Sequence, residues 1–365
     1  MSEWQTFCLK DLGKIVGGTT PSTNNPKNYG NKIAWITPKD LSTLQGRYIK
    51  KGSRSISRLG FKSCSCVLLP KHAILFSSRA PIGYVAIAKK RLCTNQGFKS
   101  IIPNKKIYFE FLYYLLKYHK DSISNIGGGT TFKEVSGATL GLFKVKIPPT
   151  YYEQQKIART LSILDQKIEN NHKINELLHT LAYKIYKYYF KYKPKNAKLE
   201  QIIIENPKSS IMVKNAQKTQ DKYPFFTSGD NILFYPKAII DGRNCFLNTG
   251  GNAGIKFYVG KASYSTDTWC ICANEFSDYL YLLLSSIKTH INQSFFQGTS
   301  LKHLQKNLLK KYPIYMPSVH EIKKFNQIIM PLLTLISINT RTSKKLEQIR
   351  DFLLPLLLKQ QVKPQ

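Results

Sequence analysis

Acidic residues and long apolar runs are scarce in this 365-residue chain. Asp and Glu total 21 against 55 Lys and Arg, which gives a formal net charge of +34. The longest apolar stretches, around Ile328–Ile338 and Phe352–Leu358, are well short of the roughly 20 residues that cross a bilayer. We therefore expect no membrane partner, and the start Met1-Ser2-Glu3-Trp4 does not resemble a signal peptide.

Motifs for catalysis are also missing. The sequence contains no GxxxxGK[ST] loop, which excludes a P-loop ATP motor. The segment Pro148-Pro149-Thr150-Tyr151 lacks the leading Asn or Asp of an adenine-methyltransferase tetrad, and Glu321-Ile322-Lys323 lacks an upstream acidic partner for a nuclease site. These absences favour a binding protein. An enzyme acting on nucleic acid through a divergent site is the alternative.

Cysteine is rare and irregularly spaced. The seven cysteines are odd in number, which indicates a reducing, cytoplasmic location. The pairs Cys64-Ser65-Cys66 and Cys270-Ile271-Cys272 are separated by one residue, whereas structural zinc sites use two to four. Alternate residues of a strand share one face, so we interpret these cysteines as buried thiols and expect no metal site.

What is abundant is positive charge, above all in the first part of the chain. Residues 1–150 contain 24 Lys and Arg but six Asp and Glu, a net charge of +18. Basic side chains near phosphates release condensed counterions, so this surplus favours a polyanionic partner. A generally Lys-rich surface is the alternative interpretation.

The chain also repeats itself. A Gly–Thr segment followed by a strand-like run and a proline occurs twice, with 169 positions from Gly129 to Gly298 and 169 from Pro148 to Pro317. Fainter matches keep nearly the same offset. They pair Arg79–Tyr84 with Gly250–Ile255, Thr94–Gly97 with Ser265–Thr268, and Phe109–Leu116 with Phe276–Leu284. A repeat this long predicts two similar β-rich domains.

Each half ends in a long helical pattern. The first runs from about Glu153 to Phe190, and the second opens near Glu321. The apolar residues that recur at helical spacing are Ile157, Leu161, Leu164, Ile168, Leu178, Leu181 and Ile185, and then Ile322, Phe325, Ile329, Leu332, Ile336, Leu346, Ile349 and Leu353. Asn171 and Asn339 interrupt these seams. Two narrow seams predict that the helices pack on each other as a coiled coil. Pro331 should kink or split the second helix.

This order resembles the specificity subunit of type I restriction–modification systems. Four sequence segments resemble that family. They are Leu12–Ser22 (LGKIVGGTTPS), Ile33–Leu41 (IAWITPKDL), Ile147–Ala158 with its Glu153-Gln154-Gln155, and Asp165–Glu169. In the second half, Pro317–Ile322 lacks the Gln pair, and the opening signature has no clear copy. Tyr223–Gly229 is expected to take the place of that opening.

The resemblance implies an α+β fold with two β-rich target-recognition domains separated by two long helices, packed as an antiparallel coiled coil with a pseudo-twofold internal repeat. The implied boundaries are 1–150 and 194–318 for the domains, and 151–193 and 319–365 for the helices. Each domain would read half of a split double-stranded DNA target. The helices would set the spacing and dock two methyltransferase subunits, which restriction subunits would join. S-adenosylmethionine, ATP and magnesium would belong to those partners, and this chain would not be an enzyme.

The geometry is compatible with that role. A helix of about 38 residues spans about 57 Å at ~1.5 Å per residue. Half-sites on one side of a duplex lie about 34 Å apart.

The sharpest candidates for DNA contact are the two Gly–Thr segments. Glycines let backbone amides approach a phosphate, and the Thr, Ser and Lys side chains add donors. The candidates are Gly128, Gly129, Thr130, Thr131 and Lys133 in the first half, and Gly298, Thr299, Ser300 and Lys302 in the second. The alternative is a structural turn before the last strand.

Other polar residues follow apolar strands or lie among Gly turns. Arg can bind guanine bidentately, and Asn or Gln can read adenine. The further candidates are Lys39, Arg54, Arg58, Lys62, Ser78, Arg79, Asn95 and Gln96, and then Arg243, Asn252, Thr266 and Thr268. Arg54, Arg58 and Lys62 recur at steps of four and would line one helical face. Solvated surface and ordinary turn roles are the alternatives, and a two-domain coiled-coil scaffold for RNA or protein is the competing function.

Overall fold

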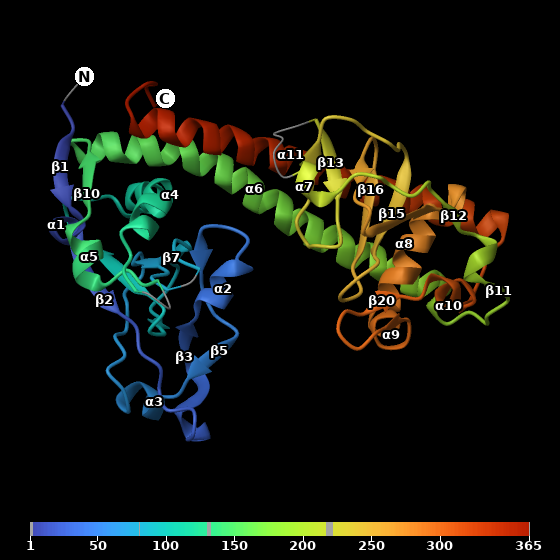
Figure 1. The fold of residues 1–365 in the computed structure, drawn as a ribbon, viewed down its shortest axis with the longest axis horizontal. Helices are drawn as coiled ribbons and strands as arrows, with labels where there is room; N and C mark the ends of the chain where they lie inside the picture. The colour runs from blue at the N-terminus through green and yellow to red at the C-terminus, as the bar shows by residue number, and fades with distance from the viewer. Residues whose placement is uncertain (1–2, 80, 130–132, 217–221, 365) are drawn as a thin grey trace. The chain divides into compact units, whose positions relative to one another are not determined.

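The computed structural model describes residues 3–79, 81–129, 133–216 and 222–364. The chain divides into two compact units, and each unit contains one β-rich block together with parts of two long helices (Figure 1). Unit 1 comprises Met1–Asn170 and Lys345–Gln365, and unit 2 comprises Asn171–Lys344. In the described residues, no helix is both long enough and apolar enough to cross a membrane.

The two long helices are α6 (Tyr151–Tyr186), which a π-helical turn η2 (Lys187–Lys191) extends, and α11 (Val319–Leu358). Both begin two residues before the predicted Glu153 and Glu321. The Ser318 hydroxyl lies 3.3 Å from the Glu321 backbone N–H, and the Thr150 hydroxyl lies 3.2 Å from that of Glu153. These N-cap hydrogen bonds supply partners for amides that a helix start leaves open, and at Ser318 a bond from its backbone N–H to the Glu321 carboxylate completes a capping box.

Pro331 was predicted to kink or split the second helix, and the splitting part of that prediction is wrong. The helix α11 continues through both Pro331 and Pro355. A proline inside a helix removes one backbone donor, and packing along the rest of the helix can offset that loss. Ile329 and Leu333 on either side of Pro331 are buried in the core of unit 2.

The two helices pack antiparallel within each unit, as predicted. In unit 1, the Arg350 guanidinium on α11 donates to Asp165 on α6 at 2.7 Å. In unit 2, Asn171 donates to Ser343 at 3.1 Å and Asn175 to Thr340 at 3.3 Å. As the residue numbers rise along α6, the numbers of the contacting residues on α11 fall, so the two helices run in opposite directions.

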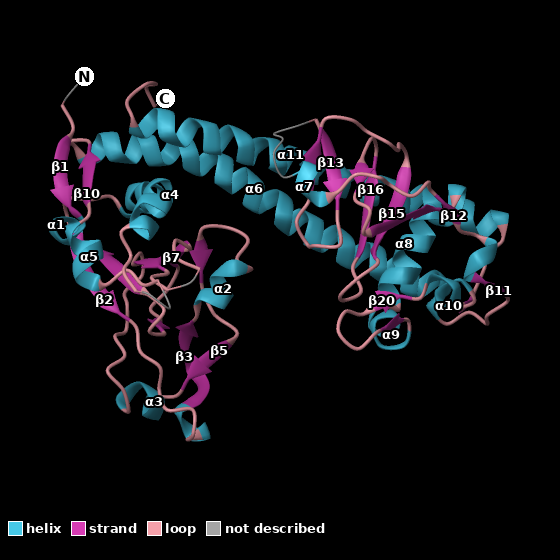
Figure 2. Cartoon of the chain, viewed as in Figure 1, coloured by secondary structure: helices cyan, strands magenta, loops and turns pink. Residues whose placement is uncertain are grey.

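The β-rich block of unit 1 contains three sheets (Figure 2). The five-stranded sheet has the order β2 (Gly13–Gly17), β9 (Lys99–Pro103), β6 (Ile74–Phe76), β7 (Val85–Ala88) and β4 (Tyr48–Ile49). The three-stranded sheet has the order β5 (Arg54–Ile56), β3 (Tyr29–Ile36) and β8 (Cys93–Thr94). The third pairs β1 (Gln5–Cys8) with β10 (Lys144–Ile147).

One amphipathic helix covers the larger sheet of unit 1. This helix, α4 (Phe109–Asn125), buries Phe111–Leu116 in the same core as Ile74, Phe76 and Ile101 of the sheet. The remaining helices of unit 1 are α1 (Leu9–Leu12), η1 (Pro26–Asn28), α2 (Pro38–Ser42), α3 (Arg58–Lys62) and α5 (Gly137–Leu142).

Unit 2 repeats this arrangement. Its four-stranded sheet has the order β12 (Ile204–Glu205), β18 (Thr268–Cys272), β15 (Arg243–Asn248) and β16 (Ile255–Val259). Its three-stranded sheet has the order β14 (Leu233–Tyr235), β13 (Tyr223–Phe226) and β17 (Ser263–Tyr264). The two-stranded pairs are β11 (Ala197–Lys198) with β21 (Pro313–Ile314), and β19 (Phe296–Gln297) with β20 (His303–Leu304).

The helix α8 (Ser277–Ser286) covers the sheet of unit 2 as α4 does in unit 1. The other helices of unit 2 are η3 (Leu199–Gln201), α7 (Val213–Ala216), η4 (Asn274–Phe276), α9 (Lys288–Ser294) and α10 (Lys306–Lys310).

Strand pairing confirms the internal repeat and corrects one alignment. The order β12-β18-β15-β16 matches β2-β9-β6-β7, and the parallel pair β13–β17 matches β3–β8. Tyr223–Phe226 therefore corresponds to the end of β3 and not to the opening signature. The counterpart of that opening lies near Leu199–Pro207, where β12 pairs with β18 as β2 pairs with β9. The residues of this segment differ too much from those of Leu12–Ser22 for the sequence alone to show the correspondence.

Candidate nucleic-acid interface

Three loops of unit 1 meet at one surface, which we call loop cluster 1 (the described residues 77–79, 81–84, 94–98, 126–129 and 133–135). The Ser78 backbone N–H donates to the Gly97 carbonyl at 2.8 Å, and the Val135 N–H donates to the Ser78 carbonyl at 2.9 Å. Gly128 and Glu134 exchange two backbone hydrogen bonds of 3.0 and 2.8 Å, which pair the two ends of the Gly–Thr segment as in a hairpin. The structure thus brings together three segments that the sequence singled out separately.

Unit 2 builds the same frame from residues 248–254, 265–268 and 296–304, which we call loop cluster 2. The Thr249 N–H donates to the Asp267 carbonyl at 3.2 Å, and the Leu304 N–H donates to the Thr249 carbonyl at 3.0 Å. These bonds match those of Ser78 in unit 1. The hairpin that carries the second Gly–Thr loop is the strand pair β19–β20, with Gln297 opposite His303.

Positive backbone φ angles explain two of the glycines. Gly129 has φ of 117° and Gly298 has φ of 139°, and both are exposed. Residues with a Cβ adopt these angles rarely, so glycine is needed for the hairpins to turn. The turn interpretation therefore holds for these two positions. It is compatible with a phosphate contact, because Gly129 and Gly298 are both exposed.

Many of the predicted contact residues are exposed on the two clusters. On loop cluster 1 these are Arg79, Gln96, Gly128, Gly129 and Lys133, with Asn95 partly buried. On loop cluster 2 they are Asn252, Gly298, Thr299, Ser300 and Lys302, with Thr266 partly buried. Thr130 and Thr131 lie outside the described residues. The polar side chains among them are donors that suit phosphate oxygens and base edges.

Three predicted residues make contacts inside the protein: Ser78 and Thr268 are buried, and Arg243 is partly buried. The Ser78 hydroxyl lies 3.3 Å from the Gly97 carbonyl and the Thr268 hydroxyl lies 3.2 Å from the Phe226 carbonyl, and both side chains are buried. Arg243 forms an ion pair with Asp278 and a 3.0 Å hydrogen bond to Thr334 on α11. All three hold the protein together internally.

The basic residues before and on α3 form a separate group. Arg54 belongs to β5 and stacks over the Tyr29 ring at 4.8 Å, whereas Arg58 and Lys62 are the first and last residues of α3. The predicted single helical face for these three is therefore wrong, because Ser57 caps α3 after Arg54. Lys39 is exposed on α2, whose Pro38 lies against Gly97 of loop cluster 1.

The sequence did not single out several residues that shape the clusters. Glu134 forms ion pairs with Arg79 at 2.9 Å and Lys99 at 3.4 Å. Burial would raise the pKa of Glu134, but Arg79 and Lys99 lower it below its ordinary value. Thr20 donates to Gln96 and so joins the opening signature to loop cluster 1. Glu134 directly follows the predicted contact residue Lys133, and this position in the sequence was the signal that could have identified it.

The counterpart of this ion pair is different in unit 2. The backbones of Arg79 and Glu134 form an isolated β-bridge, and the backbones of Gly250 and His303 form the matching β-bridge in unit 2. One frame therefore carries an arginine–carboxylate pair in unit 1 and a glycine–histidine pair in unit 2. The two clusters share their backbone hydrogen bonds and differ in the chemistry that they expose.

Two β-rich blocks that carry matching loop clusters define a binding protein with two similar recognition surfaces. The family model described as type I restriction modification DNA specificity domain matches residues 1–180 and 195–348. The chain belongs to this family of type I restriction–modification specificity subunits. It is thus a non-catalytic DNA-recognition subunit.

Individual relatives agree with the family. The chain is 33% identical over 403 residues to the type I restriction enzyme MjaIX specificity subunit of Methanocaldococcus jannaschii, covering 98% of this chain and 93% of that protein. It is 39% identical over 173 residues to the putative MjaX specificity subunit of the same organism, covering 47% of this chain and 38% of that one. A crystal structure of a type I restriction–modification S subunit from M. genitalium has the same fold, with a TM-score of 0.63, 18% identity, and coverage of 97% and 96%.

Proposed function

We propose that loop clusters 1 and 2 each read one half of a bipartite double-stranded DNA target. The observation that carries this proposal is the frame that both units share, in which Ser78 and Thr249 make matching hydrogen bonds while the exposed side chains differ. A common frame fits a common partner, the duplex backbone. Different side chains fit different bases, so the two half-sites would not be copies of one another.

The electrostatics support a nucleic-acid partner. The chain has a net charge of +34, and Lys133 and Lys302 are exposed on the two Gly–Thr hairpins. A cation beside open backbone amides forms a typical phosphate contact. Phosphate contacts would position each cluster, and Arg79, Gln96 and Asn252 would contact base edges. The scaffold alternative for RNA or protein predicts no preference for duplex DNA.

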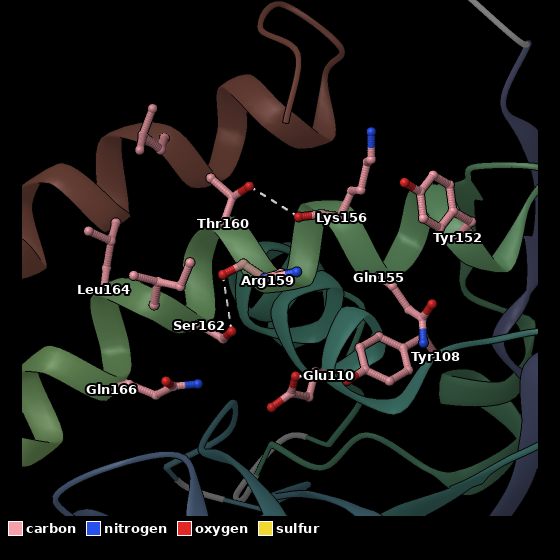
Figure 3. A pocket seen from close by; sticks show the side chains of 12 residues that line it. Tyr108, Glu110, Tyr152, Gln155, Lys156, Arg159, Thr160, Ser162, Leu164 and Gln166 are labelled. Atoms are coloured by element: carbon pink, nitrogen blue, oxygen red, sulfur yellow. Dashed lines mark hydrogen bonds between the residues drawn. The ribbon is translucent and has the colours of Figure 1, made fainter. Parts of the chain in front are cut away.

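We further propose that α6 docks a methyltransferase subunit. A groove of about 930 Å³ in unit 1 is lined by Tyr152, Lys156, Arg159 and Ile163 of α6, beside Glu110 of α4 (Figure 3). Tyr152 is 64% exposed and Ile163 is 47% exposed, which is unusual for side chains of this size. An apolar strip flanked by charges suits a protein partner.

This docking surface can be tested by copurification. Ile163→Asp places a charge in the groove and should abolish copurification with the methyltransferase while the chain keeps its melting temperature. Ile174→Asp, a 43% exposed site on α6 in unit 2, is the matched control. Equal loss with both variants would contradict the assignment of the groove in unit 1.

The remaining roles follow from this division of labour. We propose that α6 and α11 set the gap between half-sites and that two methyltransferase subunits and the restriction subunits assemble on this chain. S-adenosylmethionine, ATP and magnesium would be held by those partners. We place the complex in the cytoplasm, because all seven cysteines are free thiols.

Methylation mapping tests the proposed function directly. The chain is coexpressed with its neighbouring methyltransferase, and methylated bases are mapped across the host genome. A split motif with a fixed gap, lost when this chain is omitted, is the expected result. Methylation that is unchanged without the chain would overturn the proposal and favour the scaffold hypothesis.

A further inference from the structure

A buried arginine links the β-rich block of unit 1 to the long helix α6. The Arg47 guanidinium donates to Glu110 on α4 at 3.0 Å and to Glu169 on α6 at 3.2 Å, and its backbone N–H donates to Glu169 at 3.0 Å. Asp165 on α6 lies 3.9 Å from the same guanidinium. Arg47 is 3% exposed, so this link is made inside the protein.

Unit 2 contains a link with the same three parts. The Arg243 guanidinium donates to Asp278 on α8, to the Thr334 hydroxyl on α11 at 3.0 Å, and to the Met330 carbonyl on α11 at 3.2 Å. Asp278 is 1% exposed. In both units an arginine of the β-rich block thus bridges an acid on the covering helix to one of the long helices.

The internal repeat shows that the two links are not copies of one feature. Glu110 and Asp278 are equivalent, because they lie 168 positions apart at the start of matching helices. The arginines are not equivalent. Arg47 precedes β4, whereas Arg243 opens β15, whose counterpart β6 is a different strand. The same bridge is therefore built twice from different parts of the chain.

Stability alone does not require such a bridge. Burying charged groups carries a desolvation cost that their attraction offsets only in part, and apolar replacements often stabilise a protein equally well. Burial opposes the charge of Arg47, yet Tyr114 and the neighbouring acids raise its pKa above the ordinary value. The bridge does, however, fix the orientation of the β-rich block relative to the long helix. A guanidinium that donates to two elements at once restricts how they can rotate about each other.

We propose that Arg47 and Arg243 are positioning residues that fix the angle of each β-rich block on its long helix and thereby restrict the gap that the protein accepts between half-sites. This inference rests on the proposed function, since it assumes two reading surfaces held by the helices. The arginines touch no DNA. They act through the placement of the loop clusters, so their loss changes the accepted spacing and not the bases that are read.

The experiment measures the gap distribution of methylated sites for the coexpressed full complex. Arg47→Met and Glu169→Gln in unit 1, and Arg243→Met in unit 2, are compared with wild type. Both half-site sequences should stay the same. Methylation at sites whose gap is one base pair longer or shorter should rise about tenfold, as a small loss of angular restriction predicts. Arg47→Lys keeps one charge but not the bidentate fork, and should lie between wild type and Arg47→Met.

Arg350→Met is the matched control. It removes a partly buried arginine of unit 1 that also binds Asp165, at 2.7 Å, but joins α11 to α6 and not the β-rich block to a helix. It should lower the melting temperature and leave the gap distribution narrow. Relaxation of equal size in Arg350→Met would show general loosening and overturn the positioning role.

The failures of the two proposals are distinguishable. A wild-type complex without a split motif would overturn the proposed function and this inference with it. A wild-type split motif whose narrow gap persists in both Glu169→Gln and Arg47→Lys would overturn the inference alone. These two milder variants keep the test valid if Arg47→Met fails to assemble.

Discussion

Lys133 and Lys302 occupy the exposed hairpins of the two loop clusters, so their contribution to binding can be measured one residue at a time. Each lysine that contacts a phosphate releases about one counterion. Lys302→Ala should therefore weaken duplex binding by a similar factor for all sequences and reduce the salt slope by about 1. Binding is measured by fluorescence anisotropy over a salt series.

The control for this measurement is Lys198→Ala. Lys198 is 61% exposed in its side chain but lies in β11, outside both clusters. It should leave the salt slope unchanged. An unchanged slope for Lys133→Ala and Lys302→Ala would mean that the Gly–Thr hairpins do not contact the backbone.

Glu321 in the capping box of α11 gives a pH-dependent contribution to stability. The Ser318 backbone N–H, which donates at 2.9 Å, lowers the pKa of Glu321 to about 2 together with Tyr315 and Lys193. The folded pKa lies below the unfolded value near 4.5. The stabilisation is therefore complete above that value and is lost as the pH falls through about 2.

Glu321→Gln should consequently lower the melting temperature at pH 7, by an amount equivalent to about 1 kcal/mol, because a neutral amide replaces the charge-assisted hydrogen bonds of the carboxylate. The difference between variant and wild type should shrink as the pH falls from about 4.5 toward 2, where the wild-type carboxylate becomes protonated as well. Calorimetry at a series of pH values measures this. A difference that stays constant down to pH about 2.5 would contradict the assigned pKa.

Single residues were the hardest level to predict from sequence. Arg79 was identified because it follows an apolar strand and Lys302 because it lies in a Gly–Thr segment, and both are exposed on the clusters. Ser78 was chosen by the same logic, yet it is buried one position away from Arg79. Alternate residues after a strand point to opposite sides, and sequence alone does not show which side faces the core. Arg47 gave no sequence signal, because its partners Glu110 and Glu169 are distant along the chain.

At the scale of elements, the polar layer in the helix pair of unit 2 fixes the register of α6 against α11. Asn175 donates to Thr340 at 3.3 Å and accepts from Asn339 at 3.0 Å. A polar residue in an apolar seam specifies alignment at some cost in stability. Asn175→Leu should destabilise unit 2 by about 1–3 kcal/mol, because the Asn339 amide loses its acceptor.

Replacing both partners separates this effect from simple loss of packing. Asn175→Leu combined with Asn339→Leu should recover most of the lost stability, since no polar group then lacks a partner. Lys173→Leu, on an exposed position of α6, is the control. Chemical denaturation gives the free energy of unfolding for each. Additive losses in the double variant would exclude a coupled polar layer.

The long helices could be predicted well, but their details could not. Helical spacing and the acids Glu153 and Glu321 located both starts to within two residues. Beyond the Asn interruptions the predicted seam differs from the observed one. Leu181 is 46% exposed, whereas Ala182 and Tyr186 are buried. A period of 3.6 residues lets neighbouring positions compete for the core, and packing against the β-rich block decides between them.

At the scale of the whole molecule, the internal repeat was visible in the sequence because glycine turns and the prolines before helices are local features. Gly129 and Gly298 need unusual φ angles, and a proline precedes each long helix, so the same residue types recur at one offset. The opening of unit 2 was missed because β12 depends on pairing with β18, and a two-residue strand leaves little trace in sequence.

The proposed role of the helices as spacers leads to a test that changes their length. Seven residues inserted between Asn170 and Asn171, with seven more between Lys344 and Lys345, keep each helix face aligned to within about 20°. They lengthen the pair by about 10 Å, which corresponds to at most three base pairs of 3.4 Å. Genome-wide methylation should then show the same half-sites separated by a longer fixed gap.

Insertion in α6 alone is the control for this test. It shifts α6 against α11 and separates pairs such as Asn171 with Ser343 and Asn175 with Thr340. Methylation should be lost or its gap should become variable, because a mismatched seam no longer holds a rigid spacing. A Gly- and Ser-rich insertion at both sites should also broaden the gap, since a flexible linker lets its ends wander. A gap that stays at the wild-type length after the paired helical insertion would show that the helices do not set it.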